Sequence, residues 1–118
     1  MSTTRTLLSL LLVSIFSACS IDQTLRKADK LWQIGEYADA AAAYRKVYQQ
    51  LPSKEKARKG AVSLQMARCY NRLNATPRAL AAYQTGLRYG QPTLHDRLTF
   101  ARLLLKAGQY QNAARAFE

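Results

Sequence analysis

Three segments of this 118-residue chain repeat one pattern of small, turn and aromatic residues. In each segment an alanine is followed three residues later by leucine or tyrosine, and a turn residue comes four residues after that. A second alanine follows, and an aromatic residue stands four residues beyond it. The second and third segments begin 34 residues apart, at Ala67 and Ala101, and the first begins 39 residues before the second, at Ala28. This period indicates one structural unit repeated along the chain.

The spacing within each segment is that of a helical hairpin. Ala28 and Leu31 lie three residues apart and therefore share one face of a helix. Gly35 and Gly108, at the turn positions of the first and third segments, can adopt the left-handed conformation that ends a helix. The alanines let two helices approach closely, and the aromatic residues fill the space beside them. Because no segment shows the two-residue alternation of a β-strand, the sequence predicts an all-α fold.

Residues with capping chemistry mark the expected helix starts. Thr76 and Pro77 supply an N-cap residue and a proline at the first helical position. Thr93 and Asp96 have the spacing of a capping box, with Asp in place of Glu, and the run 20–23 (Ser-Ile-Asp-Gln) has the same spacing. These signals predict helices over about 21–34, 37–50, 55–73, 77–89, 94–107 and 110–118.

The repeated pattern, seen in "ADKLWQIGEYADAAAAYRKVYQQLP" and "ARLLLKAGQYQNAARAFE", resembles the tetratricopeptide repeat (TPR). The resemblance covers about residues 21–118. It implies helical hairpins stacked as a short right-handed α-solenoid of about two and a half repeats. The last predicted helix is cut after nine residues, and no polar capping helix follows it. We therefore expect a truncated domain, part of a longer protein, whose third hairpin frays.

The first residues have the organisation of an export signal. Arg5 precedes an apolar run over residues 7–16, which is half the length of about twenty residues that a membrane-spanning helix needs. A positive start, a short apolar core and small residues before a break describe a cleaved secretory signal peptide. An uncleaved anchor is the alternative interpretation.

The break "FSAC" at residues 16–19 resembles the lipobox of bacterial lipoproteins. That resemblance implies a signal peptide over 1–18, cleavage before Cys19, and a lipidated N-terminus at 19–20. Ser20 follows the cysteine without an acidic neighbour, which by analogy with enteric lipoproteins implies lipid anchoring in the outer membrane, facing the periplasm. An ordinary signal with an incidental cysteine is the alternative.

The charge of the chain is strongly positive, with 18 Lys and Arg residues, 7 Asp and Glu residues, and a net charge of +11. Such a balance commonly indicates nucleic-acid binding, but export argues against a nucleic-acid partner. Acidic peptides, an acidic protein face or anionic lipid headgroups are the expected partners instead. The basic cluster at 54–59 is either a solvated face or a contact to headgroups near the anchor.

Catalytic chemistry has little support in the sequence. The chain has a single histidine, its carboxylates are scattered, and no nucleophile–base pair, metal cluster or phosphate-binding glycine loop can be assembled. We therefore expect neither an enzyme nor a cofactor. If Cys19 is acylated, Cys69 has no disulfide partner, and its apolar neighbours predict a small core residue.

The TPR resemblance also implies a binding groove, because the first helix of each repeat lines a concave surface in that family. The second and third units are basic there and keep an asparagine, as do grooves that hold acidic peptide ends; a plain solvated face is the alternative. Trp32 is either a groove aromatic or a filler between helices. The candidate groove residues are Leu64, Arg68, Asn71, Arg72, Leu98, Arg102 and Lys106.

These features together predict a lipid-anchored scaffold for protein–protein interactions in the cell envelope. The lipobox followed at once by repeats also resembles the N-terminal part of TPR and OmpA-like envelope lipoproteins, some of which belong to type IX secretion. Two alternatives stay open: a β-barrel assembly lipoprotein, and a nutrient-binding helical-repeat lipoprotein that partners a transporter.

Overall fold

The computed structural model describes residues 2–117, with the side chains of residues 3–12, 19–109, 111–112 and 114–117. All regular elements in this part of the chain are helices, which confirms the predicted all-α class. The molecule is elongated, with extents of 65 × 29 × 20 Å. The helices are α1 (Ser2–Gln33), α2 (Tyr37–Gln50), α3 (Lys56–Arg72), α4 (Thr76–Tyr89), α5 (Leu94–Lys106) and α6 (Tyr110–Phe117).

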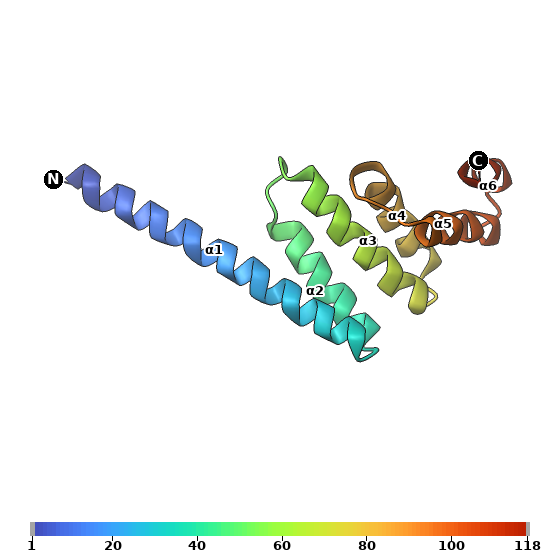
Figure 1. The fold of residues 1–118 in the computed structure, drawn as a ribbon, viewed down its shortest axis with the longest axis horizontal. Coiled ribbons are helices and arrows are strands. Elements are labelled where there is room, and N and C mark those ends of the chain that lie inside the picture. Colours follow the sequence, from blue (N-terminus) through green and yellow to red (C-terminus); the bar gives the residue numbers. More distant parts are fainter. Residues whose placement is uncertain (1, 118) are drawn as a thin grey trace.

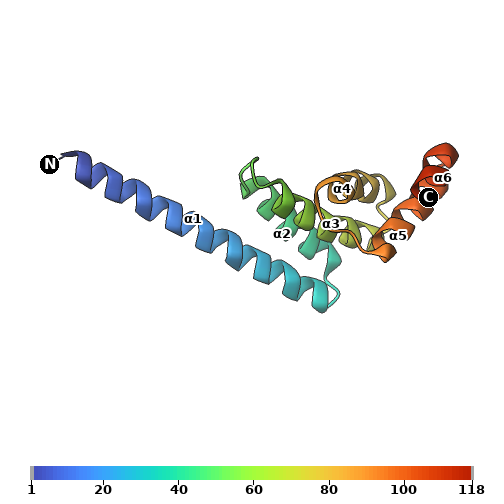
Figure 2. The same ribbon diagram turned by 45° about the horizontal axis from the view of Figure 1, so that its top comes forward.

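The helices form consecutive hairpins that lie side by side (Figure 1). Helices α1 and α2, α3 and α4, and α5 and α6 pair within hairpins, and α2 also packs along α3. The most extensive contact joins α3 to α4, whereas the contact between α4 and α5 is much smaller. Both views place α5 and α6 at the C-terminal edge of the stack (Figures 1 and 2).

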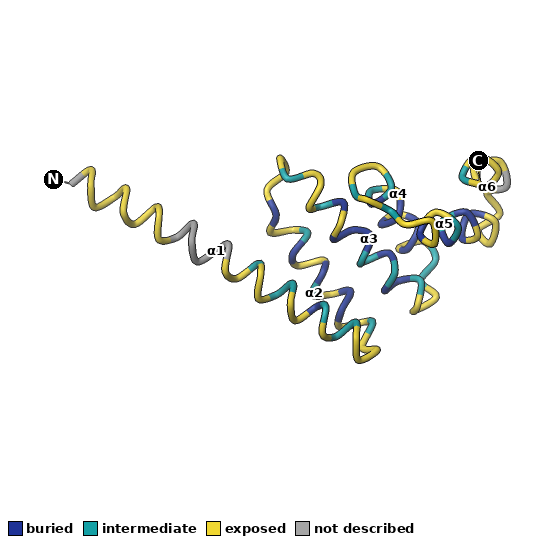
Figure 3. Tube along the Cα trace, viewed as in Figure 1, coloured by how far each residue is buried: buried dark blue, intermediate teal, exposed yellow. Residues whose placement is uncertain are grey.

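Helix α1 differs from the sequence prediction at its start. The predicted helix begins at residue 21, but α1 begins at Ser2 and continues without a break, and its first half extends away from the stack (Figure 1). The side chains of residues 3–12 are exposed (Figure 3). The capping box predicted at 20–23 is therefore wrong: Ser20 lies inside the helix, where its carbonyl accepts a hydrogen bond from the Thr24 hydroxyl at 2.9 Å.

The described helices contain none that is both long enough and apolar enough to cross a membrane. Cleavage after residue 18 stays a prediction, since a helical leader is compatible with cleavage and with retention alike.

In the first two hairpins, the repeated alanine and aromatic positions form the core, as the sequence predicts. Ala28 and Ala67 are fully buried in the first helices of their hairpins. Tyr44 and Tyr83, at the equivalent aromatic position of α2 and α4, are also buried, with 0% and 1% of their surface exposed. The Tyr44 hydroxyl donates a hydrogen bond to Asp29 of α1, which satisfies its buried oxygen. Equivalent residues thus do equivalent packing in successive hairpins.

The hairpin turns use the conformations expected of them, with one correction. Gly35 and Gly108 have φ values of +83° and +77°, and Asn74 has +56° at the same position of the second hairpin. Thr76 is not the N-cap: Ala75 holds that place, because its carbonyl accepts the first helical hydrogen bond, from Ala79 N–H at 2.9 Å. Thr76 is therefore the first helical residue, and its side chain makes no capping hydrogen bond.

A close approach of backbones between α3 and α4 has no counterpart in the sequence prediction. A Cβ atom on Gly60 would lie 2.3 Å from the backbone nitrogen of Gly90, and one on Gly86 would lie 2.5 Å from the Leu64 side chain. The Ser63 hydroxyl donates to the Ala82 carbonyl at 2.8 Å across the same contact. The absence of side-chain atoms at Gly60 and Gly86 allows α3 and α4 to make the largest contact in the molecule.

Candidate functional site

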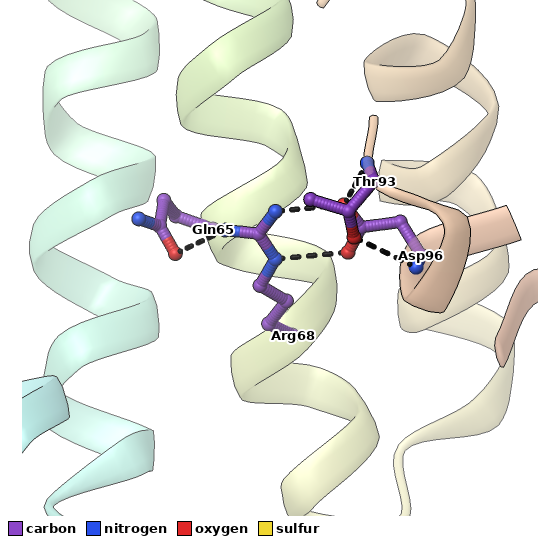
Figure 4. Close-up of polar contacts among 4 residues, drawn as sticks. All are labelled: Gln65, Arg68, Thr93 and Asp96. Carbon is purple, nitrogen blue, oxygen red and sulfur yellow. Dashed lines mark hydrogen bonds and ion pairs between the residues drawn. The ribbon is translucent and has the colours of Figure 1, made fainter. Parts of the chain in front are cut away.

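The central interaction of the predicted groove is an ion pair between α3 and α5 (Figure 4). Arg68 donates from Nε to Asp96 Oδ1 at 2.9 Å and from Nη2 to Asp96 Oδ2 at 2.7 Å. A third hydrogen bond joins Arg68 Nη1 to Gln65 Oε1 at 3.1 Å. This bidentate geometry is the strong form of the arginine–carboxylate interaction. The guanidinium is thus already bound within the chain.

Asp96 serves at the same time as a capping residue of α5. Its Oδ2 accepts from the Thr93 backbone N–H at 2.8 Å, and the Thr93 hydroxyl oxygen accepts from Asp96 N–H at 3.2 Å. The predicted capping box is therefore confirmed. Burial raises the pKa of Asp96, but the hydrogen bonds from Arg68 and Thr93 outweigh it and hold the pKa below its ordinary value of 3.8. Asp96 is therefore ionised at neutral pH and holds Arg68 in place.

Leu64 lies in the core and not on an open surface. Only 3% of its surface is exposed, and its side chain packs where Gly86 of α4 leaves space. The sequence placed Leu64 and Arg68 together in a groove as peptide contacts. The structure gives both of them partners within the fold, so that neither is free for a ligand.

Arg72 lies next to an aromatic pair from the first hairpin. The Trp32 and Tyr37 rings meet edge to face with centroids 5.0 Å apart, and the Arg72 guanidinium lies 5.9 Å and 5.6 Å from their centroids. Trp32 is half-buried, so it contributes both to packing between helices and to the surface. Such cation–π contacts are worth about 0.5–1 kcal/mol at exposed sites. Arg72 itself stays exposed beside half-buried Asn71.

The remaining groove residues belong to α5 and face two surroundings. Leu98 is half-buried, and Arg102 is exposed one turn further along the helix. Lys106 lines a separate hollow with Thr76 and Leu80 at the start of α4. The structure therefore does not join the seven predicted residues into one groove. Arg72 and Arg102 are exposed, Asn71 and Leu98 are half-buried, and peptide binding by these four residues stays a prediction.

The two cysteines lie in opposite environments. Cys19 is exposed on α1, and Cys69 is fully buried in α3, so they do not form a disulfide. Burial raises the pKa of the Cys69 thiol to about 11. Cys69 is thus the small core residue that its apolar neighbours predict. Cys19 has the accessibility that lipid transfer to its sulfur requires.

The described residues hold no group of three His, Cys, Asp or Glu side chains that could bind a metal ion. Comparison with protein-family models finds no matching family, and comparisons with curated proteins and with solved structures find no significant match.

Proposed function

We propose that this protein is a lipid-anchored scaffold of the TPR type, held in the outer membrane by Cys19, which binds other proteins of the cell envelope. The observation that carries the proposal is the equivalent burial of equivalent residues in successive hairpins: Ala28 matches Ala67, and Tyr44 matches Tyr83. Stacked hairpins of this kind expose extended surfaces and typically serve as interaction modules.

The binding surface in this proposal is the exposed edge of α3 and α5. Arg72 and Arg102 are its exposed charged groups, and Asn71 and Leu98 are its half-buried members. Arginine can bind a carboxylate with two parallel hydrogen bonds, which suits an acidic segment of a partner. Arg68 does not contact the partner in this proposal. Its ion pair with Asp96 joins the two helices that carry these side chains.

The anchor in this proposal is Cys19. It is exposed on α1, two residues before Ile21, which is the first of the described α1 side chains that packs against the core. An acyl chain there would leave the packing of the hairpins undisturbed. Each buried CH₂ group contributes about 0.8 kcal/mol to membrane attachment, so two or more chains hold firmly.

Mass spectrometry of the N-terminal peptide from exported protein tests the anchor. We expect a chain that begins at Cys19 and carries acyl groups, and a Cys19→Ala variant that is released from the membrane. A full-length product with an unmodified thiol would contradict the anchor.

Crosslinking of the full chain in intact envelopes tests the binding surface. The variant Arg72→Ala/Arg102→Ala is compared with Arg45→Ala/Arg78→Ala, which removes two exposed arginines from α2 and α4. We expect the first variant to lose its crosslinked partner and the control to keep it. Equal retention by both variants would refute this surface.

A further inference from the structure

A small pocket at one end of the stack is lined by residues from three successive helices. It has a volume of about 200 Å³ and lies between the end of α2, the start of α3 and the end of α4. Two lysines, two hydroxyl side chains and two tyrosines line it, and no carboxylate does: Tyr48, Ser53, Lys56, Lys59, Thr85 and Tyr89. Ammonium and hydroxyl donors converging on so small a space suit a compact anion with several oxygens.

The tyrosine rings hold the basic groups at the pocket. Lys59 Nζ lies 4.6 Å from the centroid of the Tyr48 ring, and Lys56 Nζ lies 5.6 Å from that of Tyr89. The Arg88 guanidinium also lies 5.4 Å from the Tyr89 ring. Aromatic faces attract cations without neutralising them. The pocket therefore keeps its positive charge while the side chains that carry it are held in position.

Two carboxylates near the start of α3 are paired with an arginine that does not line the pocket. Arg58 lies 3.7 Å from Glu55 and 3.6 Å from Asp22, so one arginine is shared by both acids. Within the described part of the chain, no carboxylate lies within ion-pair distance of Lys56 or Lys59. The pocket thus has an excess of positive charge that the fold itself does not compensate.

The start of α3 adds to this excess. The first turn of a helix carries partial positive charge and normally favours acidic residues. The first turn of α3 has none, and its N-cap residue Glu55 makes no side-chain capping hydrogen bond. Lys56 stands at the first position instead, so a cationic side chain lies at the positively polarised end of the helix. An anion bound in the pocket would relieve this repulsion.

The pocket also lies at the end of the stack that carries Cys19. Arg58 in the first turn of α3 contacts Asp22 of α1, and Cys19 precedes Asp22 by only three residues, or about 4.5 Å of helix. Figure 1 shows the connection between α2 and α3 at the end from which the free half of α1 extends. A membrane surface at Cys19 would therefore face this pocket.

We propose that this pocket binds a phosphate group, and that anionic phospholipid headgroups at the membrane surface supply it. The volume of about 200 Å³ accommodates a phosphate with part of its ester. Phosphate binding follows from the pocket alone, whereas the headgroup source rests on the lipid anchor proposed above. Bound headgroups would fix the orientation of the stack on the membrane, which a flexible lipid tether at one residue cannot do.

Vesicle binding by the full chain with Cys19→Ser tests the proposal without any contribution from the lipid. Vesicles of phosphatidylcholine with phosphatidylglycerol are compared with vesicles of phosphatidylcholine alone, which report any binding through the apolar run of α1. We expect Lys56→Gln/Lys59→Gln to weaken binding to the anionic vesicles by about 30-fold, from the usual contribution of a basic residue near such a surface. The control Lys27→Gln/Lys46→Gln removes the same charge from a different hollow, between α1 and α2, and should cost much less.

The outcomes separate the sources of the phosphate. Equal losses in the two double variants would mean attraction by net charge and would overturn the pocket, whereas a loss confined to Lys56→Gln/Lys59→Gln would support it. Titration with inorganic phosphate should shift the amide resonances of residues 56–59. Such shifts without a difference in vesicle binding would overturn the headgroup source. Failure of the lipid anchor would appear only in the mass of the Cys19 peptide, so the two proposals fail separately.

Discussion

Gly60 is the single residue on which the packing of α3 against α4 depends most directly. At an unhindered position inside a helix, replacing glycine with alanine stabilises a protein by up to about 1 kcal/mol. Here the new Cβ would meet the backbone of Tyr89 and Gly90 at 2.5 Å and 2.3 Å, and a backbone cannot turn aside as a side chain can. We expect Gly60→Ala to lower the free energy of unfolding by about 2 kcal/mol, measured by urea denaturation. A raised midpoint would show that the two helices do not approach so closely.

Asp96 makes stability depend on pH. Because its pKa in the folded chain lies below the ordinary value of 3.8, the unfolded state binds the proton more readily. The stability that the carboxylate contributes is therefore complete above about pH 4 and is lost as the pH falls through the folded pKa. We expect Asp96→Asn to cost about 2 kcal/mol at pH 7, because Arg68 loses its partner, and less at pH 3, where the unfolded state binds the proton more readily than the folded state. Urea denaturation of both proteins at the two pH values measures this, and a difference independent of pH would contradict it.

The two thiols should differ in reactivity. The Cys69 thiol is buried and its pKa is raised to about 11, so little thiolate exists near neutral pH and reagents cannot reach it. Cys19 is exposed. In protein without lipid, we expect a thiol reagent to modify Cys19 at once and Cys69 only after unfolding in urea. Cys19→Ser supplies the control, since its folded form should show no rapid reaction.

The sequence predicts correctly the residues whose role depends on local spacing. It does not predict the roles of residues whose contacts lie far away along the chain. The burial of Ala67 and Tyr83 follows from local periodicity, because the face of a helix is set by spacing alone. The role of Arg68 does not, since its partner Asp96 lies 28 residues away and on another helix. The contact of Gly60 with Gly90 has the same origin. In a sequence, a basic residue whose ion-pair partner is not known looks like a group that can bind a ligand. For this reason the sequence predicts Arg68 as a groove residue.

Among the elements, helix α1 extends toward the N-terminus beyond its described contacts with the core. Residues 2–33 contain no glycine or proline, and leucines fill the apolar run, so nothing in the local sequence ends the helix at residue 20. The sequence pattern separates the leader from the repeats by composition, and it therefore predicts that the first repeat helix begins at residue 21. The repeat helix begins by packing at Ile21, but the helix itself begins at Ser2.

We expect the stability of the stack not to depend on the first half of α1. Residues 3–12 are exposed, whereas Ile21 and Leu25 pack against the core. A chain beginning at Cys19 should therefore match the full chain within about 0.5 kcal/mol in its free energy of unfolding. Urea denaturation followed by the fluorescence of Trp32, the single tryptophan, measures this. A chain beginning after Leu25 is the contrasting case and should be clearly less stable.

For the molecule as a whole, the stack is uneven along its length because a hairpin is completed by its neighbour. Phe117 is exposed over 49% of its surface, whereas Tyr44 and Tyr83 at the equivalent position are buried. The repeat predicts this position as a core position, but in the part of the chain that the structure describes α6 packs extensively against α5 alone. The ring contact between Tyr83 and Phe100, with centroids 6.2 Å apart, is one of the few links that join α5 to α4.

Hydrogen exchange should show that the protection of backbone amides is lower in the third hairpin than in the second. Helix α3 lies between α2 and α4 and packs against both, so its amides should exchange only through opening of the whole stack. Helix α6 packs against α5 alone among its more extensive contacts, and its residues 111–112, 114–115 and 117 are exposed. We expect amides in 110–117 to exchange orders of magnitude faster than those in α4, which holds the equivalent place in the second hairpin. Equal protection of α4 and α6 would mean that the third hairpin is stabilised independently of a covering neighbour, and it would refute the view that each hairpin depends on the next.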